Sequence, residues 1–89
     1  MIKEKLTLSN KYGLHTRAAA KLVALATRFH SDITILGPTE TFNCKSIMAL
    51  LTLGATCGSS FDLVITGHDE AEAATAILQL IQNRFGEEE

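Results

Sequence analysis

The chain has 89 residues, of which 46% are hydrophobic and 20% are charged, as expected for one compact domain that spans residues 1–89. Its formal net charge of −2, from eight Lys and Arg against ten Asp and Glu, excludes the overall basic field with which proteins hold nucleic acid or an anionic membrane. The charge is nevertheless uneven, because residues 1–30 hold six cations against Glu4 alone, for +5, and residues 31–89 hold two cations and nine anions, for −7. An anionic ligand or partner is therefore expected at the N-terminal part of the chain.

The cysteine content and the hydropathy favour the cytoplasm. Cys44 and Cys57 are too few and too far apart for a zinc cluster or a C-x-x-C redox motif, and we expect both to be reduced and buried as apolar filler. No charged segment followed by an apolar run opens the chain, and no apolar run approaches the ~20 residues of a membrane span. We therefore expect a cytoplasmic protein with no membrane insertion, no metal and no other cofactor.

The first half of the chain changes from a strand pattern to a helix pattern and back. In residues 2–8, Ile2, Leu6 and Leu8 stand at alternate positions, with Glu4 between them and polar side chains at the positions in between. This period of two predicts a half-buried strand that leads into a turn at residues 11–13. From Thr16 the apolar side chains recur at the i, i+3, i+4 spacing of a helix with one buried face. Residues 32–36 are rich in β-branched side chains and end at a Gly-Pro turn, so together with residues 39–44 they predict an antiparallel hairpin.

The second half supplies two more helices and one more strand. Ser46 precedes a short apolar segment that ends near Gly54, which predicts a helix capped by the serine hydroxyl. Residues 61–66 alternate as a fourth strand, Asp69 is expected to cap a last helix, and the acidic residues 86–89 are expected to form a frayed tail. The order β-α-β-β-α-β-α, with connections too short for most parallel crossovers, predicts an α+β fold with one four-stranded antiparallel sheet and three helices on one face.

One segment combines three features of a phosphate site. His15 and Arg17 stand at the start of the first predicted helix, where the backbone N–H groups of residues 16–18 (Thr16, Arg17 and Ala18) lack intrahelical partners and form an anion site with the helix dipole. The fork of Arg17 can bind phosphate oxygens in bidentate fashion, and a neutral imidazole beside it can attack phosphorus. A lone histidine at a helix start is, however, more often a capping or surface residue, so both interpretations stand at this point.

Ser46 also has two interpretations that are compatible. As an N-cap it stabilises its helix by about 1 kcal/mol; as a phosphorylation site it would place a dianion where the helix dipole tolerates it. The neighbouring apolar side chains are expected to lie partly in the core and, where exposed, to form a small docking surface for partners; the candidates are Ile47, Met48, Leu51 and Ala20. His30 and His68 have no adjacent cation and are expected to be surface residues.

These residues form motifs of one known family. Gly13-Leu14-His15-Thr16-Arg17, followed by Lys45-Ser46-Ile47-Met48 and then by Leu53-Gly54, strongly resembles the HPr family, the histidine-containing phosphocarrier proteins of the bacterial phosphoenolpyruvate-dependent phosphotransferase system. The resemblance covers nearly the whole chain and includes residues 67–70 before the last helix. The family's fold is an open-faced β-sandwich with a four-stranded antiparallel sheet and three helices on one side, in agreement with the predicted order of elements.

The resemblance implies a phosphoryl relay. His15 would take the phosphoryl group from phosphorylated enzyme I on its Nδ1 atom and pass it to an enzyme IIA domain, while Arg17 and the N–H groups of residues 16–18 would stabilise it. Ser46 would be the target of a regulatory HPr kinase/phosphorylase, and the residues around Met48 would help to dock partners. Such a protein is a monomeric carrier that is consumed and regenerated, so its status as an enzyme is left open.

Two positions depart from the family pattern. Ala18 replaces the usual proline after the arginine, which restores an N–H at the helix start and puts the phosphate geometry in question. Tyr12 replaces a small polar residue of many members, which bears on the choice of partner.

Two alternatives to sugar uptake remain, namely a nitrogen-branch HPr paralogue that uses His15 for regulation, and a purely regulatory binding module switched at Ser46.

Overall fold

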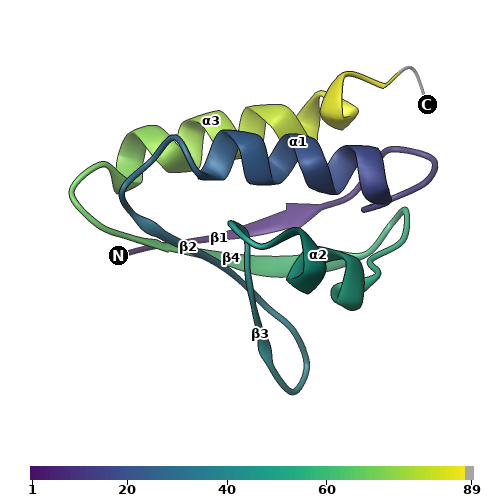
Figure 1. Ribbon diagram of the computed structural model, residues 1–89, viewed down its shortest axis with the longest axis horizontal. Coiled ribbons are helices and arrows are strands. Elements are labelled where there is room, and N and C mark those ends of the chain that lie inside the picture. The colour runs from purple at the N-terminus through teal and green to yellow at the C-terminus, as the bar shows by residue number, and fades with distance from the viewer. Residues whose placement is uncertain (88–89) are drawn as a thin grey trace.

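The computed structural model describes residues 1–87, in which strands and helices follow one another in the predicted order (Figure 1). The elements are β1 (Ile2–Thr7), α1 (Thr16–Ala26), β2 (Asp32–Leu36), β3 (Thr41–Asn43), α2 (Ile47–Leu53), β4 (Ser60–Thr66), α3 (Glu70–Gln82) and a short 3-10 helix, η1 (Arg84–Gly86). The strands form one sheet in the order β1-β4-β2-β3, and every neighbouring pair is antiparallel. The α+β class and the antiparallel, open sheet with three helices are confirmed.

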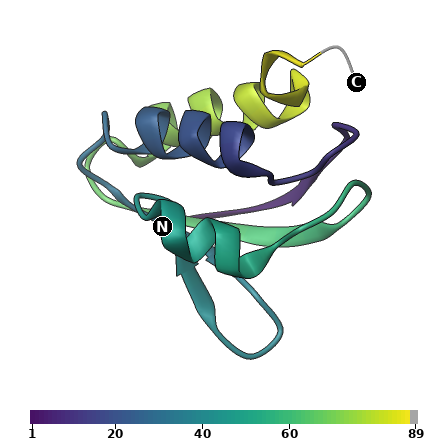
Figure 2. The same cartoon turned by 45° about the vertical axis from the view of Figure 1, so that its right-hand side comes forward.

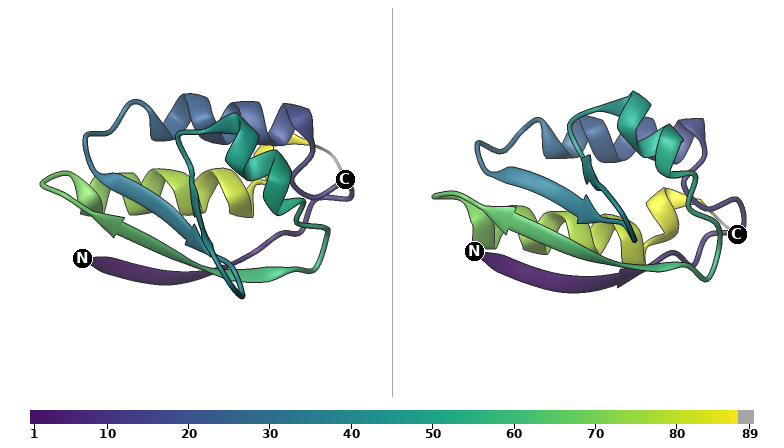
Figure 3. Two further views of the ribbon diagram at one scale, coloured as in Figure 1. Left: turned by 60° about the horizontal axis from the view of Figure 1, so that its bottom comes forward. Right: turned by 90° about the horizontal axis from the view of Figure 1, so that it is seen from below.

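The period-two patterns of the strands place one face of the sheet in the core. On the central strand β4, Leu63 and Ile65 are fully buried, and they pair with Ile35 and Ile33 of β2, which are buried as well. The residues between them point to the other face, which Figure 3 presents from the side opposite to α1 and α3. Burial of alternate residues on neighbouring strands fixes the register, because a slip by one residue would expose the whole apolar set.

The helices cover the buried face. α1 and α3 contact one another and run side by side above the strands, with α3 over β1 and β4, while α2 packs against α1 and β3 (Figure 2). The buried face of α1 includes three alanines, Ala18, Ala19 and Ala26, whose small side chains allow close packing. The start of α1 and the end of α3 lie at the same end of the molecule (Figure 1). Within residues 1–87, no helix is long and apolar enough to cross a membrane.

Two expectations about single residues need correction. Asp69 occupies the N-cap position of α3, but its carboxylate makes no capping bond and instead accepts hydrogen bonds from the backbone of His30 and Ser31 and from the Ser31 hydroxyl. Cys44 is buried as expected, whereas Cys57 is exposed in the loop between α2 and β4.

Of residues 86–89, which the sequence suggests as a frayed tail, the first two make defined contacts. Gly86 closes η1, and the side chain of Glu87 is held by two hydrogen bonds. From the sequence, a glutamate in an acidic tail is expected to be solvated. In the structure, the carboxylate of Glu87 instead contacts the side chains of Asn10 and His15 near the start of the chain. The remaining two residues, Glu88 and Glu89, lie outside the described residues.

Candidate functional site

The loop between β1 and α1 is held in one shape by a buried asparagine and a glycine. Asn10 is fully buried, and its Nδ2 donates to the carbonyl of Gly13 at 2.7 Å. Gly13 has a φ of +62°, and a Cβ at this position would lie 2.5 Å from the Ala55 carbonyl oxygen, so only glycine fits. The next residue, Leu14, donates its N–H to the same carbonyl at 2.9 Å. The loop that leads to His15 is therefore fixed against the segment after α2.

His15 is the N-cap residue of α1, as the sequence predicts for the start of that helix. Its backbone is extended, and its carbonyl accepts the first helical hydrogen bond, from the N–H of Ala19. No side chain caps this end, and within residues 1–87 no acceptor bonds the N–H groups of Thr16, Arg17 and Ala18. These three N–H groups therefore have no acceptor among the described residues; Thr16 and Arg17 are exposed and Ala18 is buried beneath them. The helix dipole makes this position favourable for an anion.

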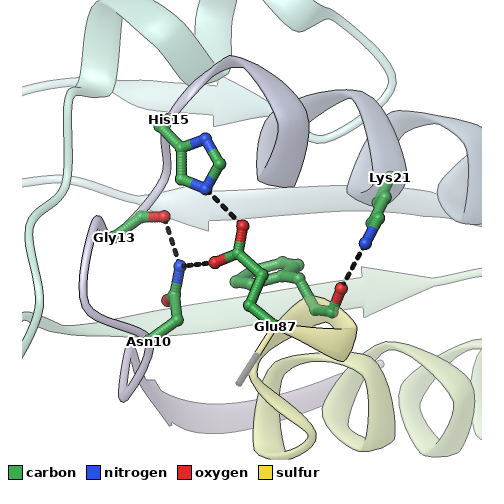
Figure 4. Close-up of polar contacts among 6 residues, drawn as sticks. Asn10, Gly13, His15, Lys21 and Glu87 are labelled. Carbon is green, nitrogen blue, oxygen red and sulfur yellow. Dashed lines mark hydrogen bonds and ion pairs between the residues drawn. The ribbon is translucent and has the colours of Figure 1, made fainter. Parts of the chain in front are cut away.

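The imidazole of His15 is oriented by a carboxylate from the end of the chain (Figure 4). Its Nε2 lies 2.6 Å from Oε2 of Glu87, and the other oxygen of Glu87 accepts a hydrogen bond from Asn10 Nδ2 at 2.9 Å. The ring also meets the ring of Tyr12 edge-on, at 5.9 Å between centroids. In Figure 4 the second ring nitrogen, Nδ1, lies on the side of the ring away from Glu87.

The charges around the imidazole favour an ionised Glu87. The hydrogen bond from Asn10 lowers the pKa of this carboxyl, and the hydrogen bond from His15 and the positive charge of Arg17 lower it further. Arg17 itself is exposed in the first turn of α1. The structure therefore brings His15, Arg17 and the unbonded N–H groups of the first turn of α1 to one place, and adds the carboxylate of Glu87, which the sequence did not suggest.

The other candidate residues lie mostly on α2. Ser46 is the N-cap, and its hydroxyl accepts a hydrogen bond from the N–H of Ala49 at 3.2 Å, which confirms the predicted cap. Met48 is 69% exposed and Leu51 is 36% exposed, whereas Ile47 is half-buried against the core.

Ala20 is exposed on α1, the helix that α2 contacts. The candidate docking residues thus include an accessible apolar group of two side chains on α2.

Sequence reasoning missed Asn10 and Glu87. Asn10 stands at the end of a predicted strand, and its contact with Glu87 joins residues 77 positions apart. Glu87 lies 72 residues from His15 in the sequence, so no local pattern could connect the two. One feature of the sequence could have pointed to Glu87: an aromatic residue, Phe85, lies two positions before it. An aromatic side chain so near the end of a chain is expected to pack in the core, as Phe85 does, and would hold the following residues against the molecule.

Comparisons with known proteins place the chain among relatives of one family. A family model described as "PTS HPr component phosphorylation site" matches residues 2–83. The phosphocarrier protein HPr of Cupriavidus necator is 45% identical over 89 residues, which cover 100% of both chains. A crystal structure of HPr from Thermoanaerobacter tengcongensis superimposes with a TM-score of 0.95 at 39% identity, covering 100% of both chains. A structure described as an HPr dimer from the same organism gives a TM-score of 0.75 at 38% identity and covers 98% of this chain and 100% of that one.

Proposed function

Since this chain belongs to the HPr family, the phosphocarriers of the phosphotransferase system, we propose that His15 accepts a phosphoryl group on Nδ1 from enzyme I and passes it to an enzyme IIA domain. The observation that carries the proposal is the position of the imidazole beside three N–H groups, those of Thr16, Arg17 and Ala18, at the open end of α1. These groups can hold an anion that is attached to the ring. The 2.6 Å contact of Nε2 with Glu87 leaves Nδ1 as the nitrogen for the reaction.

The transfer forms a nitrogen–phosphorus bond on His15 and breaks the bond that holds the phosphoryl group on enzyme I. The Nδ1 lone pair of His15 attacks the phosphorus, and the electron pair of the breaking bond returns to the donor atom of enzyme I. The negative oxygens of the transferred group then lie near the open N–H groups and Arg17, whose guanidinium can bind them. Because a nitrogen–phosphorus bond on an imidazole is labile, the group can be passed on to the next acceptor.

Ala18 does not remove this site. Proline has no N–H, so the alanine adds one donor to the first turn of α1. Its side chain is fully buried and packs in the core, which fixes the start of the helix. We therefore expect transfer to remain possible with alanine at this position.

Enzyme I and the enzyme IIA domain would bind the end of the molecule where His15 lies. The exposed side chains of Met48 and Leu51 supply an apolar contact there, together with Ile47 and Ala20 at its border. A partner with an acidic rim would complement the positive charge of residues 1–30. We further propose that the protein acts as a monomeric single domain in the cytoplasm, although one of the similar proteins has been described as a dimer.

Ser46 is proposed as a second, regulatory site. Its hydroxyl is half-buried and accepts the N–H of Ala49 as the cap of α2. A phosphate on this oxygen would keep an acceptor at the helix start and add charge beside Met48. Phosphorylation by an HPr kinase/phosphorylase would therefore change partner binding at the docking residues more than it changes the fold. The nitrogen-branch and purely regulatory alternatives are not favoured.

Intact mass spectrometry tests the carrier function. The purified protein is incubated with phosphoenolpyruvate and enzyme I, and its mass is measured at neutral and at acid pH. The expected result is the gain of one acid-labile phosphoryl group, retained in Ser46→Ala and lost in His15→Ala. A wild-type protein that gains no group, or a His15→Ala protein that still gains one, would refute the proposal.

A further inference from the structure

The C-terminal turn is anchored by more than the contact with His15. Phe85 is buried in the core, and its carbonyl accepts a hydrogen bond from Nζ of Lys21 on α1 at 2.6 Å. Arg84 and Phe85 have φ values of 54° and 57°, in the left-handed region that residues with a Cβ seldom adopt. This conformation turns the chain back over the start of α1 and directs the side chain of Glu87 to the loop before it (Figure 4).

The carboxylate of Glu87 has a separate donor for each of its oxygens. Asn10 Nδ2 donates to Oε1, and the Nε2 of His15 lies against Oε2. The orientation of the Asn10 amide is set independently, because the same Nδ2 also donates to the carbonyl of Gly13. The side chain of Glu87 is 12% exposed and that of His15 is 29% exposed, so water competes little for the carboxylate oxygens.

We propose that Glu87 is a positioning residue of the phosphoryl relay, one that keeps the proton of His15 on Nε2 and so presents the lone pair of Nδ1 to phosphorus. The inference rests on the proposed carrier function and adds a residue to it. An ionised carboxylate can only accept a hydrogen bond, so the nitrogen facing it must carry the proton. A histidine whose one nitrogen donates to a carboxylate has its tautomer and ring orientation fixed.

The same carboxylate balances the charge that the reaction creates. When the lone pair of Nδ1 forms its bond to phosphorus, the bond from phosphorus to the donor atom of enzyme I breaks and the donor keeps that electron pair. The ring of His15 then carries phosphorus on Nδ1 and hydrogen on Nε2, and so has a positive charge beside Glu87. No proton has to leave the site in either direction of transfer, because it stays within the bond between Nε2 and Oε2.

A merely structural role for Glu87 makes a different prediction. The turn is held by the buried ring of Phe85 and by the bond from Lys21, neither of which uses Glu87. Replacing the carboxylate by an amide of the same shape should therefore leave the fold in place. Any effect on the tautomer of His15 then comes from the chemistry of the side chain at position 87.

The substitution Glu87→Gln gives a sharp test because Asn10 decides how the amide must sit. The donor Nδ2 of Asn10 requires the amide oxygen on its side, which turns the amide NH₂ toward Nε2 of His15. Nε2 must then accept a hydrogen bond, so the ring proton moves to Nδ1. The lone pair of Nδ1 is then no longer available to attack phosphorus. Glu87→Ala, which removes both groups, should leave a mixture of the two tautomers. Glu72→Gln is the matched control, since Glu72 is exposed near the other end of α3.

The experiment has two readouts on these variants. Nitrogen-15 chemical shifts of His15 in the unphosphorylated protein report the tautomer and need no enzyme I. Quench-flow transfer from phosphorylated enzyme I reports the rate. We expect Nε2 protonated in the wild type and in Glu72→Gln, Nδ1 protonated in Glu87→Gln, and transfer to the latter slower by roughly ten- to a hundredfold.

Two results would overturn the inference: the wild-type tautomer in Glu87→Gln, or transfer to Glu87→Gln at the wild-type rate. Failure of the carrier function itself looks different. In that case the wild-type protein would take no phosphoryl group, whereas the tautomers would still follow the side chain at position 87.

Discussion

Reversing the charge of Arg17 should slow phosphoryl transfer strongly without unfolding the protein. The side chain is exposed in the first turn of α1 and bears on the site through its positive charge next to Glu87. A hydrogen bond to a charged group contributes about 1.5–3 kcal/mol, which corresponds to roughly ten- to 150-fold in rate. Arg17→Gln should fall in this range. Arg17→Glu also repels the phosphoryl oxygens, so we expect about 100-fold or more.

The effect of Arg17→Glu on stability should be small. Substitutions at exposed positions usually change the free energy of unfolding by less than about 0.5 kcal/mol, and an acidic side chain in the first turn of a helix is favourable. With an unfolding entropy of about 2.1 cal/mol/K per residue, the 89 residues give a change in Tm of at most about 3 °C.

The assay compares Arg17→Glu with Arg28→Glu, which makes the same charge reversal at an exposed residue beyond the other end of α1. Quench-flow rates from phosphorylated enzyme I are measured beside thermal unfolding by circular dichroism. If both variants lose the same rate, the effect comes from net charge and not from the site. A wild-type rate in Arg17→Glu would remove this residue from the mechanism.

Three further predictions concern other parts of the structure. Ser46→Ala should lower the free energy of unfolding in urea by about 1 kcal/mol through loss of the cap, and Ser46→Asp should restore it; equal stability of all three proteins would contradict the capping role. The hydrogen bonds from the Ser31 hydroxyl and from the backbone hold the pKa of Asp69 at about 2, so its stabilisation is present above about pH 4 and lost as pH falls toward 2. Asp69→Asn should flatten the pH dependence of the urea midpoint in this window, and an unchanged slope would refute the assignment. Burial raises the pKa of Cys44 to about 12, so iodoacetamide at mildly alkaline pH should modify the exposed Cys57 alone, and rapid double labelling of the folded protein would be the contrary result.

The elements that follow from local patterns were predictable. The three-to-four spacing from Thr16 predicts α1, the β-branched run of residues 32–36 matches β2, and Ser46 caps α2 as expected. In each case the controlling interaction joins residues that are close in sequence or share one face. His15 and Arg17 were identified for the same reason, since both belong to the first turn of one helix.

The features that the sequence did not predict depend on contacts between residues far apart in the chain. The position of Asp69 just before α3 predicts a side-chain cap for that helix. Its carboxylate instead accepts three hydrogen bonds from the turn before β2, so it makes no capping bond. Cys57 is apolar enough to be buried, yet its loop lies on the surface. In the sequence, Glu87 looks like part of a charged tail. In the structure, the left-handed residues of η1 turn the chain so that Glu87 contacts His15.

The central claim is that His15 carries a phosphoryl group between two partners, and a chase experiment tests it most directly. The protein is labelled with radioactive phosphoryl from phosphoenolpyruvate, separated from enzyme I, and mixed with an enzyme IIA domain. The label should leave His15 and appear on the acceptor, at a rate that rises with acceptor concentration. Label that stays on the protein, or appears as inorganic phosphate at a rate independent of the acceptor, would contradict it.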